Sequence, residues 1–137
     1  MARAYGANIQ VCAHFETVYG APPSGDWIKL PIVSTTLGAE QPLIANAVLG
    51  LGREPVDPLR DVIRDEGDVV VPVDVRNFGH WLKLLLGPPV TTGAGPYVHT
   101  FTSGAAALPS LSLEIGMPEA ARYFVQGGVL ANTMALR

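Results

Sequence analysis

The residues of this chain that could perform chemistry are three histidines, one cysteine and a group of carboxylates. His14, His80 and His99 lie far apart in the sequence, and no two of them share a motif. Histidine acts as a general acid, a base or a metal ligand only when suitable partners surround it. His99 alternates with Tyr97 and Phe101, which favours a histidine packed on a strand face over a metal ligand.

Cys12 and His14 are two residues apart and would share one face of a strand, so a thiol nucleophile with a histidine base is conceivable. No oxyanion-binding turn and no third, orienting residue accompanies the pair. We therefore interpret Cys12 as a small, half-buried thiol. Because it is the only cysteine, it excludes an intrachain disulfide and a multi-cysteine zinc site.

An acidic cluster is the last candidate for a metal site, and it consists of Asp61, Asp65, Glu66, Asp68 and Asp74. Calcium loops place carboxylates at alternate positions and end on a glutamate, an order that is missing here. A charged hairpin tip is the simpler interpretation. The sequence also lacks a phosphate-binding glycine pattern and a G-x-S-x-G motif. We expect no catalytic, cofactor or metal site, and the chain is not expected to be an enzyme.

The segments that would position these residues are mostly strands, because apolar residues recur at every second position. Paired glycines at 127–128 predict a bulge within the last of them. The expected strands cover residues 9–15, 27–30, 97–102, 111–115 and 121–136.

Residues 59–76 are predicted to form a β-hairpin whose arms are 59–64 and 69–75 and whose turn is 65–68. The next segment predicts one short helix at about 78–86, with Asn77 as its N-cap and Gly87 as its end. We expect the aromatic face of this helix to pack on the sheet and His80 to lie on its exposed side.

Residues 34–58 show neither the strand nor the helix period and contain several prolines and glycines, which predicts a long loop. Disorder would require a polar, charged composition, but this segment is rich in leucine, isoleucine and valine. The loop could pack on its own domain or against a neighbouring subunit, because exposed apolar patches mark interaction sites.

The composition favours self-association. The chain is 48% hydrophobic and only 15% charged, with a mean hydropathy of +0.28, whereas a typical domain is about 25% charged. No apolar run is long enough to span a membrane, and the N-terminus shows no secretory signal. A net charge of −3 with dispersed lysines and arginines argues against specific nucleic-acid binding. We predict a single domain, residues 1–137, of mainly β (α+β) class.

Six segments in series resemble the N-terminal part of the major tail tube proteins of long-tailed bacteriophages. The resemblance covers most of residues 6–133 and is carried by residues 15–22, 27–31, 37–44, 68–87, 97–104 and 108–116. It implies an antiparallel β-sandwich or barrel with one short flanking helix and a long interface loop. It also implies hexameric rings that stack into a hollow tube.

By the same resemblance, the chain would be a structural virion protein of the phage tail, assembled in the bacterial host cytoplasm. Its partners would be further copies of itself, the tape-measure protein and other tail proteins, with DNA only as transiting cargo. No membrane partner and no cofactor are expected. The expected subunit or ring contacts lie in the long loop and at the hairpin tip, at Leu43, Ile44, Val48, Leu49, Asp65 and Glu66.

Two other functions stay open at this point. A tail terminator or connector would form a closed ring rather than a stack. A small β-barrel enzyme or ligand-binding domain would use His99, Cys12 or the acidic cluster, and it would need a deep pocket with convergent polar groups.

Overall fold

The computed structural model describes residues 6–21, 23–46, 48 and 56–136. The protein is mainly β with antiparallel pairing, as expected. Residues 1–33 and 71–137 make one compact unit, and residues 34–70 make a second. That the two units together act as one domain, residues 1–137, stays a prediction.

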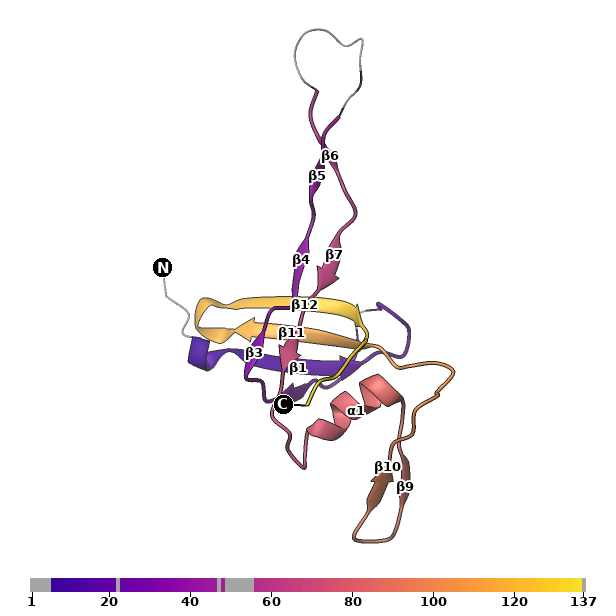
Figure 1. Cartoon of the computed structure of the whole chain (residues 1–137). Helices are drawn as coiled ribbons and strands as arrows, with labels where there is room; N and C mark the ends of the chain where they lie inside the picture. Colours follow the sequence, from indigo (N-terminus) through magenta and orange to yellow (C-terminus); the bar gives the residue numbers. More distant parts are fainter. Residues whose placement is uncertain (1–5, 22, 47, 49–55, 137) are drawn as a thin grey trace. The chain divides into compact units, whose positions relative to one another are not determined.

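A four-stranded antiparallel sheet forms the body of the first unit, in the order β12-β11-β1-β2 (Figure 1). The strands are β1 (Gln10–Phe15), β2 (Ile28–Leu30), β11 (Leu111–Met117) and β12 (Arg122–Val129). Short 3₁₀ turns precede β1 (η1, Gly6–Asn8) and join β11 to β12 (η2, Pro118–Ala120). Each of the two outermost strands, β2 and β12, has one backbone edge that pairs with no other strand among the described residues.

Alternation along β1 and β11 creates one apolar face. Val11 lies opposite Ile115 and Leu30, and Ala13 lies opposite Leu113. Because successive side chains point to opposite faces, these residues share one side of the sheet. Among the described residues, the buried apolar side chains are Val11, Ala13, Leu30, Leu84, Leu111, Leu113 and Ile115.

The single helix, α1 (Phe78–Leu86), covers that apolar face near the end of β1. Leu84 is buried, and the Lys83 ammonium lies 4.0 Å from the centroid of the Phe15 ring. The His80 ring lies 6.2 Å from the same ring. His80 is therefore half-buried rather than on the exposed side, so that expectation was wrong.

The N-terminus of α1 is organised by Asp74 and not by the side chain of the N-cap residue. Asn77 occupies the N-cap position, but its side chain caps no helical N–H. Instead the Asp74 carboxylate accepts bonds from the backbone N–H groups of Arg76 and Asn77 and from the Asn77 amide. The sequence pattern therefore identified the N-cap residue correctly, but the capping hydrogen bond expected from the Asn77 side chain was wrong.

Strand β12 contains the predicted bulge. Leu113 lies opposite Gln126, but Leu111 lies opposite Val129. Two residues of β12, 127 and 128, therefore lie between these pairs where β11 has only residue 112. Gly128 has φ of +71°, a left-handed conformation that favours glycine. The expected continuation of the strand to residue 136 was wrong, because β12 ends at Val129.

The second unit, residues 34–70, is one long hairpin. Its outgoing arm holds β3 (Ser34–Thr35), β4 (Gly38–Glu40) and β5 (Leu43–Ile44). These strands pair with β8 (Val69–Val70), β7 (Arg64–Glu66) and β6 (Leu59–Arg60) of the returning arm. Figure 1 shows the arms side by side at β4 and β7 and again at β5 and β6.

This pairing contradicts the hairpin predicted at 59–76. Residues 64–66 do not lead into a turn but pair with residues 38–40 across the long hairpin. Gly67, with φ of +157°, allows close approach of the arms: an added Cβ would lie 2.6 Å from the backbone oxygen of Thr36. Within the segment predicted as a loop at 34–58, residues 34–35, 38–40 and 43–44 therefore belong to paired strands.

A further two-stranded hairpin follows α1. Its strands are β9 (Val90–Thr92) and β10 (Val98–Thr100), and they pair only with each other (Figure 1). The strand predicted at 97–102 is confirmed, although it is shorter.

Candidate assembly surfaces

Glu16 ties the end of β1 to two distant segments of the first unit. One carboxylate oxygen accepts bonds from the Ser110 hydroxyl (2.6 Å) and the Gly20 backbone N–H (2.8 Å). The other accepts bonds from the Ser112 hydroxyl (2.6 Å) and the Gly128 backbone N–H (2.8 Å). Four donors therefore converge on one side chain.

The electrostatics of Glu16 follow from this arrangement. Burial alone would raise the pKa of the carboxyl group. The hydrogen bonds from Ser110, Ser112, Gly128 and Gly20 stabilise the ionised form more strongly and lower the pKa from 4.5 to about 2. Glu16 is thus an ionised side chain that holds three segments together through four hydrogen bonds, an arrangement we call the Glu16 tie. No sequence motif indicated it.

The three histidines are dispersed as predicted. His14 packs against Trp27, with ring centroids 6.1 Å apart, and His80 packs against Phe15. The His99 ring nitrogen Nδ1 lies 2.8 Å from the Thr91 hydroxyl. Each histidine has a local structural neighbour, but His99 lies on an exposed strand, so the expectation that it packs on a strand face was wrong.

Cys12 lies between two charged residues, opposite Glu114 on β11 and Lys29 on β2. Burial raises the pKa of the Cys12 thiol; Glu114 adds to this effect and Lys29 opposes it. A raised pKa keeps the thiol protonated, whereas the thiolate is the nucleophile. The arrangement therefore favours an unreactive thiol.

The acidic residues do not form a metal site. Asp65 and Glu66 lie on β7 opposite Ala39 and Gly38. Hydrogen bonds from Asn77, from both its side chain and its backbone, lower the pKa of Asp74. Within the described part of the chain, no group of three or more His, Cys, Asp or Glu residues is placed to hold a metal ion.

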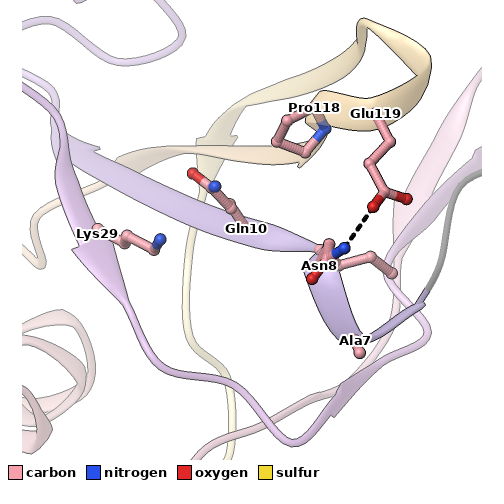
Figure 2. A pocket seen from close by; sticks show the side chains of 7 residues that line it. Ala7, Asn8, Gln10, Lys29, Pro118 and Glu119 are labelled. Atoms are coloured by element: carbon pink, nitrogen blue, oxygen red, sulfur yellow. Dashed lines mark hydrogen bonds between the residues drawn. The ribbon is translucent and has the colours of Figure 1, made fainter.

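An open recess of about 350 Å³ lies beside the start of β1 (Figure 2). Figure 2 shows Asn8 and Glu119 joined by a hydrogen bond at one end and Lys29 at the other. Neither the histidines nor Cys12 line it; its walls are Ala7, Asn8, Ile9, Gln10, Lys29, Pro118 and Glu119. The residues proposed for an enzyme do not converge here.

The expected contact residues of the long hairpin are strongly exposed. Leu43 is 63% exposed, Ile44 is 48% exposed and Val48 is 56% exposed. Leu49 lies outside the described residues. No described residue between 34 and 70 is buried, so this hairpin presents apolar side chains that its own unit does not cover.

Edge strand β12 is the second exposed apolar surface. Tyr123, Phe124 and Val125 are each more than half exposed. No charged residue occurs between Arg122 and Arg137. Natural sheets usually protect a free edge with charges, prolines, bulges or short strands. Strand β12 has one charge at its start, Arg122, and a bulge near its end, but residues 123–126 between them carry neither a charge nor a proline.

The comparison with known proteins decides the family. The profile of the family described as "Phage tail tube protein" matches residues 6–137, nearly the whole sequence. The chain belongs to the phage tail tube protein family. This tail tube protein is therefore a structural component of the phage tail, and it assembles with other tail proteins. A search of curated proteins finds no match.

Family membership accounts for the absence of a convergent polar site among the described residues, because tail tube proteins are structural. Within those residues, no helix is both long and apolar enough to cross a membrane. The apolar composition is explained instead by uncovered strands and hairpins.

Proposed function

We propose that this tail tube protein assembles into closed rings, hexameric as the family resemblance implies, that stack into a hollow tube for the passage of DNA. The observation that carries the proposal is the sheet with two open edges, β2 on one side and β12 on the other. Two different complementary edges on one chain generate head-to-tail contacts, which close into rings when the rotation allows it.

Strand addition at β12 supplies the contact between neighbours. An incoming strand from the next subunit would satisfy the free backbone groups of β12, as in other β-augmentation interfaces. Its side chains would also pack beside the exposed Tyr123 and Val125, which share one face of β12. The proposed ring is thus a continuous sheet built from four strands of each subunit.

The sheet face opposite α1 would line the lumen. Lys29 and Glu114 flank Cys12 in register on this face, so one positive and one negative charge lie close together. Affinity for DNA depends on several basic groups that neutralise phosphates, and this face presents no basic stripe. Such a surface lets DNA pass without holding it.

The long hairpin would contact the next subunit or ring. Its exposed Leu43, Ile44 and Val48 supply the apolar part of that contact, and Asp65 and Glu66 on β7 supply a charged part. We include Leu49 from the sequence pattern alone. The tape-measure protein would occupy the lumen during assembly in the host cytoplasm.

Size-exclusion chromatography combined with negative-stain microscopy of the purified chain tests the proposal. We expect rings and hollow tubes at high protein concentration. Closed rings that never stack would favour a terminator or connector instead. A chain that stays monomeric at every concentration would refute self-assembly.

A pair of matched variants tests the role of the β12 edge. Val125→Lys places a charge on the edge strand, while Val75→Lys places the same charge at a fully exposed position outside any strand. We expect Val125→Lys to abolish rings and Val75→Lys to preserve them. Equal assembly of both variants would show that β12 is not the contact.

A further inference from the structure

The hairpin of β9 and β10 is a further exposed element that the family assignment does not explain. It pairs with no other strand of the described chain, and every residue from 90 to 100 is exposed. An isolated two-stranded hairpin is marginally stable in water. We therefore expect another protein surface to cover this hairpin in the assembled protein.

The two faces of this hairpin differ in chemistry. Val98 lies opposite Thr92 and Thr100 lies opposite Val90, which places four β-branched side chains on one face. The opposite face carries the hydrogen-bonded pair of Thr91 and His99. Val90 is 66% exposed and Val98 is 57% exposed, so the β-branched face is uncovered.

The hairpin lacks the usual protection against strand pairing. No Asp, Glu, Lys or Arg occurs from Leu84 to Leu113, whereas all three residues of β7 in the long hairpin are charged. Charges normally keep exposed edges from pairing with other chains. An uncharged hairpin with a β-branched face is suited to a partner that is itself uncharged and apolar.

The same chain carries such a counter-surface. Residues 123–136 contain no charged side chain. Among them Phe124, which lies opposite Ile115 and therefore on the α1 side of the sheet, is 55% exposed. Tyr123 and Val125 point to the other face. A partner with acidic or basic recognition groups would find no opposite charge on the hairpin. Two distinct, chemically matched patches on one chain are the requirement for a head-to-tail contact between copies.

We propose that the face formed by Val90, Thr92, Val98 and Thr100 docks on residues 123–136 of a second copy of this chain. The inference rests on the proposed self-assembly and adds a specific surface to it. The side chain of Phe124 makes this contact on the α1 side of the sheet, while the backbone edge of β12 and the opposite face remain available to a neighbouring strand.

Thiol labelling tests whether a copy covers the hairpin. In a Cys12→Ser background, Val98→Cys places a single thiol on the β-branched face. We expect labelling by a maleimide to be slower by about tenfold or more in assembled particles than in unassembled chains, because thiol reactions require access. Equal labelling in both states would overturn the inference and would leave the face free for a different tail protein.

A matched pair of charge variants decides the matter if Val98→Cys fails to assemble. Val90→Asp and Thr91→Asp introduce the same charge at adjacent positions on opposite faces. We expect Val90→Asp to raise the concentration needed for assembly by about tenfold or more, equivalent to about 1.4 kcal/mol, and Thr91→Asp to change it much less. Equal effects of the two variants would overturn the assignment of the face. Circular dichroism checks that both variants fold.

A cross-link identifies the counter-surface. Chains with Val98→Cys and chains with Phe124→Cys, both in the Cys12→Ser background, are mixed, assembled and treated with a bis-maleimide. We expect cross-links that join the two types of chain. Protection of Val98→Cys without such cross-links would refute residues 123–136 as the docking site.

The failures of the two proposals are distinguishable. If the unmodified chain forms tubes but the thiol at position 98 stays accessible in them, the hairpin inference fails and self-assembly stands. If the unmodified chain forms no assemblies at all, the proposed function fails and this inference fails with it.

Discussion

The four-stranded sheet and the long hairpin at 34–70 are stabilised by different kinds of interaction. The sheet buries Val11, Leu111 and Leu113 almost completely, so the hydrophobic effect stabilises it from within. The hairpin buries none of its described residues. Its described order rests on backbone pairing and on bonds such as that from Asp68 N–H to the Thr36 hydroxyl (3.0 Å).

Polar groups differ between the two regions in the same way. In the sheet unit, Glu16 gathers four donors from three separate segments. In the hairpin, the Gln41 amide donates to the Asp61 carbonyl at 2.9 Å in an exposed setting, where water competes. The comparison indicates that the sheet determines folding, while the hairpin is available for contacts between copies.

The largest expected effect is the loss of a buried sheet residue. Leu113→Ala should lower the free energy of unfolding by about 2–5 kcal/mol, because it removes transfer energy and leaves a cavity. Leu43→Ala in the exposed hairpin should change it by about 0.5 kcal/mol or less. Urea unfolding measures both values. Similar losses in the two variants would contradict the proposed contrast.

The Glu16 tie should give the next largest effect. Glu16→Gln removes the charge that four donors share and should lower the free energy of unfolding by about 2 kcal/mol, within the range for hydrogen bonds to charged groups. Glu40→Gln, on exposed strand β4, serves as the control. Urea midpoints that match between the variants would show that the tie contributes little.

Acid should weaken the sheet through the same residue. The pKa of Glu16 is lowered in the folded protein, so its contribution is present above the unfolded pKa of 4.5 and is lost as the pH falls towards about 2. The stability difference between the wild type and Glu16→Gln should therefore shrink over that range. A difference that stays constant from pH 6 to pH 2, measured by urea unfolding, would refute the lowered pKa.

A smaller effect is expected at the bulge of β12. Gly128→Ala should lower the free energy of unfolding by about 1–2 kcal/mol, because a left-handed conformation is strained for residues other than glycine. The new Cβ would also lie 3.0 Å from Cζ of Tyr19. Gly104→Ala has a similar positive φ but open space around it, so it separates strain from crowding. A neutral Gly128→Ala variant would show that the bulge relaxes.

The sequence was informative where a strand buries one face. Val11, Ala13 and Leu113 follow the strand period because alternate positions meet the core, and the expected β1 and β11 are present. The helix at Phe78–Leu86 was equally readable from its apolar spacing and the glycine that ends it. In the strands and in the helix, burial of one face produced the apolar periodicity that the sequence shows.

The long hairpin could not be predicted for the same physical reason. Its strands are two or three residues long and exposed on both faces, so no period develops. Pairing between Thr35 and Val69 is set by partners far apart in the chain, and Gly67 suggested a turn that does not exist. The Glu16 tie was equally hidden, since Ser110 and Ser112 are distant in sequence.

The most direct test of the division between folding and assembly uses the double variant Leu43→Asp/Ile44→Asp. Its urea unfolding curve and its appearance by negative-stain microscopy are compared with those of the unmodified chain. Because both side chains are exposed, we predict an unfolding free energy within about 0.5 kcal/mol of the original, together with loss of tubes. Intact tubes, or a large loss of stability, would contradict the assignment of the long hairpin to assembly.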